Sequence, residues 1–457
     1  MTKNTIKLRQ FALFCVDLII LFSSIFLSLL IRYSALPSVE SYLIHLLHFV
    51  PIITVWLISM YIMNTYNLNK ILVKMRWVLA LTVSALLAML VGFSFFYLLF
   101  SSIINPRGFL ILYILLSLTL LMLWRYVYIS IVKRKKELVH ILFVGYESIV
   151  EEIIPYLEKD NYFEYRMMGI FETSKELQEC ITASEYMIKN RQELLEHFKQ
   201  ELPDIIVISD EKTIDKDIKN DLFNLMGEHQ FILLHDFYEI LLRKIPIGSI
   251  HDSWVLSNID TTSKRLFFIF KRIFDIVISF SILCIIFFPS LLLAIAIKLD
   301  SKGSVFFKQV REGMGGRRFT IIKFRTMKIE GNTFTPTEKK DARVTRLGRF
   351  LRQTRLDEFP QFINVLKGDM SIIGPRPERP ELSLTFKTEV PFYKQRLLVR
   401  PGITGWSQIS DAYDYPTVEE TCKKVQLDLY YIKNCSLLLD ASILLKTVAI
   451  LFLRIGI

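Results

Sequence analysis

Histidine is missing from the motif-rich last part of this 457-residue chain, since all seven histidines lie at or before His251. The five cysteines are scattered, and they form no Cys-x-x-Cys pair and have no histidine in metal-ligand spacing. These absences exclude imidazole acid–base chemistry and a zinc site from that part. Reactions there must use carboxylates, together with any cation that oxygen atoms bind.

The fingerprint of a dinucleotide site is also missing. Strand-like stretches, HILFVGY at 140–146 and DIIVISD at 204–210, are separated by helix-like charged segments, a pattern typical of an α/β domain. A strand ending in Gly145 before a helix resembles the first unit of a Rossmann-type fold, but one glycine stands where GxGxxG needs three. We therefore predict a degenerate Rossmann-like cytoplasmic module at 137–262, with a structural or regulatory role rather than a cofactor site.

Apolar residues, by contrast, are abundant: 52% of the chain is hydrophobic and the mean hydropathy is +0.37, too high for a soluble protein. Four apolar runs approach the ~20 residues that span a hydrocarbon core. They are 11–31, 43–63, 78–100 and 109–131. Lysine and arginine concentrate before the first run, between the second and third, and after the fourth, so the positive-inside rule places both flanks in the cytoplasm. Region 1–136 is thus predicted to be a four-helix transmembrane anchor.

A fifth apolar run, 273–297, contains Pro289 and has cations on both sides, with Lys271 and Arg272 before it and Lys298 after it. Both ends therefore look cytoplasmic, although the length alone permits a span. Proline removes a helix hydrogen bond and bends the chain. We predict a re-entrant helix that bends at Pro289 and leaves on the same face, which makes the part that follows monotopic.

The net charge of +11 and the pI near 9.2 raise the question of nucleic acid. The excess cations flank apolar runs or surround carboxylates, which favours anionic lipid head groups and phosphate-bearing substrates instead. At the C-terminus, the apolar segment 437–457 carries Asp440, Lys446 and Arg454, so we expect an interfacial helix rather than a span.

The chain is organised around 346–380, where Asp357 and Glu358 lie among many arginines. A helix-period apolar run from Phe359 to Leu366 follows the pair and stops at Gly368, so the carboxylates lie at or just before a helix N-terminus. An isolated acidic pair there is usually a helix cap. The arginines around it favour anion chemistry.

Five motifs follow the fifth apolar run: GSVFFKQVREGMGGRRFTIIKFRTM (303–327), DARVTRLGRFLRQTRLDEFPQ (341–361), GDMSIIGPRPERPE (368–381), VRPGITGWSQ (399–408) and LDLYYIKNCSLLLD (427–440). Together they closely resemble the bacterial sugar transferase family, the monotopic polyprenol-phosphate phosphoglycosyl transferases that start exopolysaccharide, O-antigen and capsule repeat units. The resemblance covers 264–457, and the four runs plus the α/β module are similar to the long form of the family. It implies a catalytic domain at 263–457, including the re-entrant helix.

The resemblance implies transfer of a sugar 1-phosphate from a UDP-sugar to undecaprenyl phosphate, with release of UMP and a covalent phosphosugar on an aspartate. By position, Asp357 is the nucleophile and Glu358 a Mg²⁺ ligand. Chemistry favours the same division, because helix neighbours diverge by ~100° and two adjacent acids rarely serve one atom. An aspartate is also ionised at neutral pH and needs no general base.

Five cations are our candidates for binding substrate phosphates: Lys323, Arg325, Arg352, Arg376 and Arg400. Arginine suits forked contacts with phosphate oxygens, whereas lysine acts as a point charge. Asp369 is a candidate second metal ligand, with a turn role as the alternative. Phe288 occupies the place before the proline that is often serine in the family.

The predicted enzyme is a multi-pass protein of the bacterial inner membrane, with its N-terminus and catalytic domain in the cytoplasm. Glucose or galactose 1-phosphate is the cargo that the resemblance favours, while N-acetylated sugars and a homo-oligomer stay open. Two alternatives remain: a membrane nucleotide-sugar dehydratase or epimerase, which requires GxGxxG and a Tyr-x-x-x-Lys pair, and a non-catalytic assembly scaffold.

Overall fold

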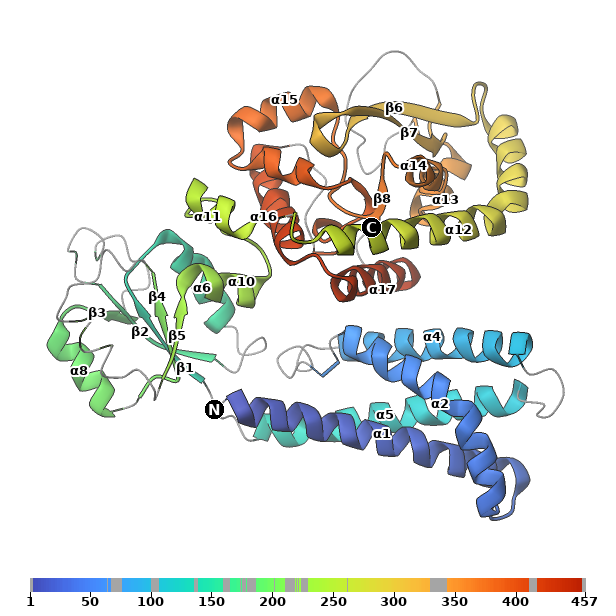
Figure 1. Ribbon diagram of the computed structural model, residues 1–457, viewed down its shortest axis with the longest axis horizontal. Helices are drawn as coiled ribbons and strands as arrows, with labels where there is room; N and C mark the ends of the chain where they lie inside the picture. Colours follow the sequence, from blue (N-terminus) through green and yellow to red (C-terminus); the bar gives the residue numbers. More distant parts are fainter. Residues whose placement is uncertain are drawn as a thin grey trace. The chain divides into compact units, whose positions relative to one another are not determined.

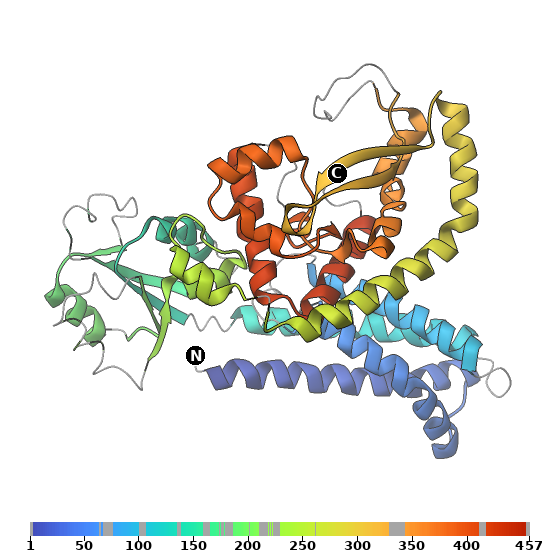
Figure 2. The ribbon, with the colours of Figure 1, turned by 45° about the horizontal axis from the view of Figure 1, so that its top comes forward.

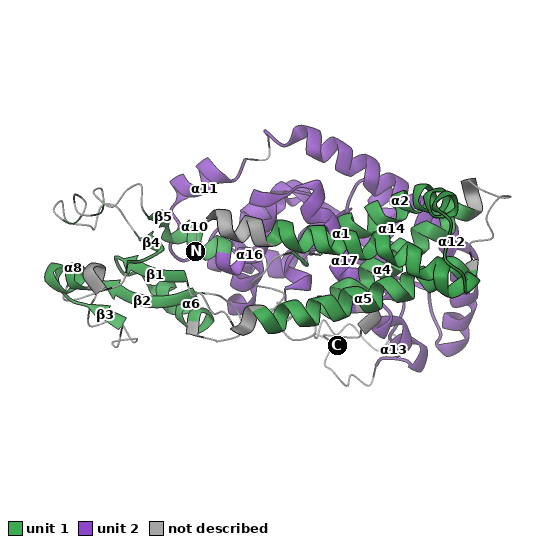
Figure 3. Cartoon of the chain, turned by 90° about the horizontal axis from the view of Figure 1, so that it is seen from below, with its two compact units in different colours: residues 1–240 green, residues 241–457 purple. Residues whose placement is uncertain are grey.

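The structure of the protein is a computed structural model. It describes residues 3–63, 65–66, 76–99, 107–134, 139–158, 165–172, 174, 178, 186–200, 202–209, 218, 220, 222, 229–260, 262–328, 343–410 and 417–453. The chain divides into two compact units, Met1–Ile240 and Leu241–Ile457 (Figure 3).

Four long helices open the first unit: α1 (Lys3–Tyr33), α2 (Val39–Ile62), α4 (Arg76–Leu99) and α5 (Arg107–Arg134). They lie side by side (Figure 1) around a core that includes the fully buried Trp56 and Tyr113. All four helices are long and apolar enough to cross a membrane, as is one helix of the second unit. The four helical runs predicted from the sequence are confirmed.

A buried ion pair joins two of these helices. Asp17 of α1 and Arg125 of α5 approach to 2.5 Å, and both side chains are almost fully buried. The Arg125 guanidinium also lies 5.2 Å from the centre of the Tyr66 ring. Since an unpaired charge is costly in an apolar interior, the acidic residue of the first helix is matched by a cation on the last of the four.

A five-stranded parallel sheet completes the described part of this unit. Its strands are β1 (Val139–Val144), β2 (Tyr165–Phe171), β3 (Met187–Ile188), β4 (Ile205–Ile208) and β5 (Gln230–Leu233), in the order β3-β2-β1-β4-β5. Helices α6 (Ser148–Glu158), α8 (Arg191–Gln200) and α10 (Leu234–Leu242) accompany it. Both strands predicted in this region are confirmed, as β1 and β4.

The carboxyl end of β1 is closed by an acidic side chain. Gly145, just after β1, has a φ of 86°, which suits glycine. The buried Glu172 accepts hydrogen bonds from the Tyr146 amide at 2.8 Å and the Ser174 amide at 2.9 Å. A carboxylate thus takes the amide that would face a phosphate in a dinucleotide-binding loop.

The second unit begins with α11 (Asp252–Asn258) and α12 (Arg265–Asp300), followed by an antiparallel hairpin of β6 (Phe306–Glu312) and β7 (Arg318–Phe324). Next come α13 (Arg346–Gln353), the 3-10 turn η3 (Leu356–Glu358), α14 (Gln361–Lys367), β8 (Ser371–Ile373) and α15 (Pro380–Glu389). The chain continues with η4 (Tyr393–Leu398), β9 (Gly402–Thr404), η5 (Ser407–Ile409), α16 (Val418–Asn434) and α17 (Leu437–Leu453). One core joins most of these elements.

Helix α12 is continuous through Pro289, and its ribbon turns so that the last part, which leads to β6, runs in a new direction from the first (Figures 1 and 2). Helix α12 is therefore bent but unbroken, which agrees with the predicted bend. The Ser290 hydroxyl donates to the Phe287 carbonyl at 3.0 Å and also to that of Ile286. Hydrogen bonds of this kind, from a serine hydroxyl to a carbonyl three or four residues earlier, often bend helices. Ser290, directly after the proline, makes them here, whereas Phe288, directly before it, has no hydroxyl to donate.

The charges of the last helix all contact groups within the second unit. Asp440 of α17 pairs with Lys271 of α12 at 2.6 Å and accepts from the Tyr431 hydroxyl at 2.8 Å. The Lys446 ammonium lies 4.7 Å from the centre of the Trp406 ring. These contacts account for polar groups in an apolar segment, which docks against β8, β9 and η5.

Candidate functional site

The acidic pair lies on a short turn between two helices. Thr345 caps α13, since its hydroxyl accepts from the Gly348 amide at 2.9 Å. A Cβ on Gly348 would lie 2.0 Å from the Thr326 carbonyl oxygen, so only glycine lets α13 approach the chain after β7 this closely. Arg355 then adopts a left-handed conformation, with a φ of 56°, directly before η3. Such a conformation is uncommon for a residue with a side chain and often marks a functional turn.

The helix predicted after the pair is α14, and it is confirmed. Pro360 is its N-cap, and Gly368, with a φ of 94°, ends it as the C-cap. The Phe362 and Val365 side chains are buried in the core of the unit. Asp357 and Glu358 thus lie in the turn η3, shortly before the N-cap of a helix whose apolar side chains are buried.

The two carboxylates are both buried, with 9% of Asp357 and 8% of Glu358 exposed, but their surroundings differ. The Lys323 Nζ of β7 donates to Glu358 Oε1 at 2.7 Å. The same oxygen has Arg376 at 3.8 Å and Arg355 at 3.9 Å. Asp357 forms no ion pair within 4.0 Å among the described residues. One carboxylate is therefore held by cations and the other is left available.

These surroundings move the two pKa values apart. Burial and the Glu358 charge raise the pKa of Asp357 from 3.8 to about 6, although Lys323, Arg352 and Arg355 oppose the change. Burial also acts to raise the pKa of Glu358, but the nearby Lys323, Arg376 and Arg355 charges outweigh it and lower the pKa to about 2. At neutral pH Asp357 is mainly ionised, held in a site that disfavours its charge, which is what a carboxylate nucleophile requires.

Three of the five predicted cations come together at the pair. Lys323 and Arg376 contact Glu358, and Arg352 lies close enough for its charge to act on the pKa of Asp357. The Arg352 Nε also donates to the Thr326 hydroxyl at 2.9 Å.

The other two cations hold helix ends. Arg325 Nη2 donates to the carbonyls of Ile297 and Ser301, at 3.3 and 2.6 Å, at the C-terminal end of α12. Arg400 Nε donates to the Gly368 carbonyl at 3.1 Å, behind α14. Neither contacts the acidic pair within the described ranges, and both cap helix ends, while their contact with phosphate stays a prediction.

Sequence reasoning passed over Arg355, Asn364 and Arg272. Arg355 stands two residues before Asp357 and could have been found by that spacing alone. The buried Asn364 amide of α14 donates to the Thr320 carbonyl at 2.8 Å and accepts from the Ile322 amide at 3.2 Å, so it joins α14 to the strand that carries Lys323. No sequence signal distinguishes this asparagine from a surface residue.

Arg272 of α12 donates to the carbonyls of Val365 and Leu366, at 2.6 and 2.9 Å, at the C-terminal end of α14. A cation is favourable there because helix carbonyls at that end lack partners. The charge in the sequence was read only as a topology signal.

No group of three His, Cys, Asp or Glu side chains that could hold a metal occurs among the described residues. Asp369 lies past the far end of α14 from the pair, where Asn364 Nδ2 approaches it to 3.5 Å. Mg²⁺ usually binds through one or two carboxylates together with substrate phosphates. Glu358 fits this habit as a single buried carboxylate beside the cations that would face substrate phosphates, with Lys323 and Arg376 both within 4.0 Å of its Oε1.

The sequence of the chain is similar to a known family of proteins. A sequence model described as bacterial sugar transferase matches residues 266–454. The chain is 41% identical to a UDP-N-acetylgalactosamine-undecaprenyl-phosphate N-acetylgalactosaminephosphotransferase of Aeromonas hydrophila, over 48% of this chain and 51% of that protein.

Two further relatives carry the name UDP-glucose:undecaprenyl-phosphate glucose-1-phosphate transferase. The one from Xanthomonas campestris pv. campestris is 32% identical over 67% of this chain and 65% of its own length. The one from Caulobacter vibrioides is 42% identical over 39% of this chain and 68% of its own length. The chain thus spans about half to two thirds of the curated relatives described here. The chain belongs to the bacterial sugar transferase family.

Proposed function

We propose that the protein transfers a sugar 1-phosphate from a UDP-sugar to undecaprenyl phosphate, releases UMP and so starts a polysaccharide repeat unit. The observation that carries this proposal is the unequal acidic pair: a buried, cation-bound Glu358 beside an Asp357 whose charge is destabilised. Family membership and the names of the relatives agree with it.

In the first step, a carboxylate oxygen of Asp357 attacks the phosphorus that bears the sugar. The bond between that phosphorus and the bridging oxygen of the diphosphate breaks, and UMP leaves with the electron pair. Lys323, Arg352, Arg355 and Arg376 face the charge that spreads over the phosphate oxygens, because cations stabilise a phosphoryl transition state. An ionised aspartate needs no base, which agrees with the absence of histidine after His251.

In the second step, a phosphate oxygen of undecaprenyl phosphate attacks the same phosphorus. The bond from Asp357 to phosphorus breaks, the carboxylate is regenerated, and the sugar leaves on a lipid diphosphate. Glu358 would hold Mg²⁺, which neutralises diphosphate charge when bound. The residues of the chain supply the rest: Lys323 keeps Glu358 ionised, and burial keeps water from the phosphorylated aspartate.

The membrane arrangement forms part of the proposal. Helices α1, α2, α4 and α5 act as a four-helix anchor, and α12 enters and leaves the cytoplasmic face of the inner membrane by its bend. The β3-β2-β1-β4-β5 sheet has a Rossmann-like strand order. In the loop after β1, the Glu172 carboxylate binds the Tyr146 amide that would face a cofactor phosphate, which supports a structural or regulatory module.

The candidate sugars are those that appear in the names of the relatives, together with the one that the sequence resemblance implies. One relative is named for N-acetylgalactosamine and two for glucose, and the sequence resemblance adds galactose. Undecaprenyl phosphate and the UDP-sugar are the proposed substrates, and membrane lipid is the proposed surroundings.

A reconstituted assay tests the proposal. Purified full-length protein is mixed with undecaprenyl phosphate, Mg²⁺ and a panel of UDP-sugars, and UMP release is measured. We expect one or more sugars to give UMP, and UDP-sugar labelled in the sugar to mark the protein when the lipid is left out. Asp357→Asn should abolish both signals.

Asp369→Asn is the matched control, because it makes the same chemical change at the far end of α14. It should retain UMP release and labelling, because the position of Asp369 past the end of α14 away from the pair favours its turn role over the metal role. Normal product formation by Asp357→Asn would refute the covalent route, and a wild-type protein that releases no UMP from any sugar would refute the transfer itself.

A further inference from the structure

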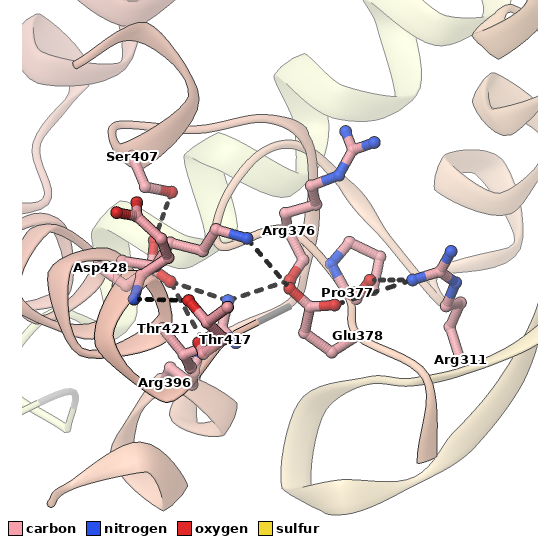
Figure 4. Close-up of polar contacts among 11 residues, drawn as sticks. Arg311, Arg376, Pro377, Glu378, Arg396, Ser407, Thr417, Thr421 and Asp428 are labelled. Atoms are coloured by element: carbon pink, nitrogen blue, oxygen red, sulfur yellow. Dashed lines mark hydrogen bonds and ion pairs between the residues drawn. The ribbon is translucent and has the colours of Figure 1, made fainter. Parts of the chain in front are cut away.

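Behind the acidic pair, a second buried ion pair holds the loop that carries Arg376 (Figure 4). Arg396 of η4 and Asp428 of α16 approach to 2.9 Å, and their side chains are 3% and 1% exposed. The Arg396 Nε donates to the same Asp428 oxygen at 3.1 Å, and the Ser407 hydroxyl donates to the other at 2.9 Å. Asp428 is therefore fixed from two sides.

The pair is tied to the loop through one backbone atom. Arg396 Nη2, which already contacts Asp428, also donates to the Arg376 carbonyl at 3.1 Å. The guanidinium can do this because its donors form a rigid planar fork. The same residue, Arg376, extends its side chain in the other direction to within 3.8 Å of Glu358.

The next two residues of the loop are held from other elements. Arg311 of β6 donates to the Pro377 carbonyl at 3.0 Å. Glu378 lies 3.9 Å from both Arg311 and Lys424 of α16. Three successive loop residues are thus anchored by side chains from β6, η4 and α16, and in Figure 4 the Arg376 guanidinium points away from these contacts.

The loop also leans on the backbone of β9. Gly374 N donates to the Thr404 carbonyl at 2.9 Å, and Gly402 N donates to the Pro375 carbonyl at 2.9 Å. A Cβ on Gly402 would lie 2.1 Å from Gly374 N, so the two strands meet only as glycines. Backbone hydrogen bonds thus hold the loop at Gly374 and Pro375, and the hydrogen bond from Arg396 holds the carbonyl of Arg376 itself.

We propose that Arg396 and Asp428 form a positioning pair for transfer, which fixes the Arg376 backbone and thereby places its guanidinium at the diphosphate. This role rests on the proposed function, because the diphosphate is the substrate of that reaction. A buried arginine and aspartate are costly to desolvate, so the pair by itself is weak evidence for a stabilising role, and its contact with the Arg376 carbonyl favours a role in geometry. A long side chain on a fixed backbone also loses less freedom when it binds phosphate.

A double-mutant cycle separates positioning from folding. Arg396→Lys keeps a cation for Asp428 but removes the fork that reaches the Arg376 carbonyl. We expect kcat/KM for the UDP-sugar to fall about tenfold, as the loss of one charged hydrogen bond predicts. In an Arg376→Lys background, the same change should have an effect of less than about twofold, because the group it positions is already altered.

Arg325→Lys is the matched control. It also replaces a buried guanidinium that donates to backbone carbonyls, but those carbonyls belong to the end of α12. Its effect should multiply with that of Arg376→Lys. If Arg396→Lys multiplies in the same way, the positioning role is wrong while the transfer activity of the wild type still stands.

Ser407→Ala provides a milder variant should Arg396→Lys not fold. It removes one hydrogen bond to Asp428 and leaves the ion pair in place. A loss of about threefold that disappears in the Arg376→Lys background supports the proposal, whereas a loss that persists there contradicts it. A wild-type protein without UMP release overturns the proposed function and this role with it.

Discussion

Neutralising each member of the acidic pair should change the stability of the protein in opposite directions. Asp357 is ionised in a buried site that raises its pKa from 3.8 to about 6, so its charge opposes folding. Glu358 has its pKa lowered from 4.5 to about 2 by Lys323 and two arginines, so its charge favours folding. Asp357→Asn should therefore raise the Tm, and Glu358→Gln should lower it.

The magnitude follows from the two pKa values. At pH 8 Asp357 is ionised in both the folded and the unfolded protein, and its charge destabilises the folded protein by at most about 3 kcal/mol. Asp357→Asn removes this penalty. This penalty develops as the pH rises from 3.8 to about 6, and at pH 5 it is about half as large. For Glu358 the stabilisation of about 3 kcal/mol is complete above pH 4.5 and is lost only as the pH falls toward about 2.

Thermal unfolding of purified full-length wild type, Asp357→Asn and Glu358→Gln at pH 8 and pH 5 measures these effects. The gain from Asp357→Asn should shrink by about half at pH 5, and the loss from Glu358→Gln should stay nearly constant. Asp369→Asn controls for the chemical change itself. Equal signs for the two variants, or a gain for Asp357→Asn that does not depend on pH, would refute the division of the pair.

Three more outcomes are expected. UMP release should fall about tenfold from pH 7 to pH 5, because Asp357, with a pKa of about 6, becomes protonated; a pH series of initial rates measures this. Lys323→Gln should lower kcat/KM about 100-fold, and Arg355→Gln, whose side chain is 49% exposed, by less than about fivefold, in the same assay. Asn364→Leu leaves the Thr320 carbonyl and Ile322 amide without their partner and should lower the Tm by about 5–10 °C in a thermal scan.

Local patterns in the sequence predicted the elements well. The four apolar runs, the strands at β1 and β4, and the helix from Pro360 to Gly368 follow from hydrophobic period, length and capping residues, which act within a few positions. The acidic pair was found because two adjacent carboxylates stand among many arginines at the start of a helix-period apolar run. The strand order and the contact between β8 and β9 depend on distant segments, and no local pattern predicts them.

The cations show where this reasoning ends. Lys323 and Arg325 stand two residues apart in one motif, yet one contacts Glu358 and the other holds the end of α12. The strand ends between them, so the alternation that would place both side chains on one face no longer applies. Motifs identify which residues a fold needs, whereas tertiary contacts decide which of them meets the substrate.

The two hydrogen bonds that Arg272 donates to the C-terminal end of α14 have a mechanical consequence. Arg272 belongs to α12, the helix proposed to enter the bilayer, and it donates hydrogen bonds to the Val365 and Leu366 carbonyls. The turn that carries Asp357, the proposed nucleophile, comes shortly before the opposite end of α14, and a seven-residue helix is only about 10 Å long. We therefore expect a tilt of α12 to move the turn that carries Asp357, so that turnover should depend on the thickness and packing of the surrounding bilayer and should differ between lipid and detergent.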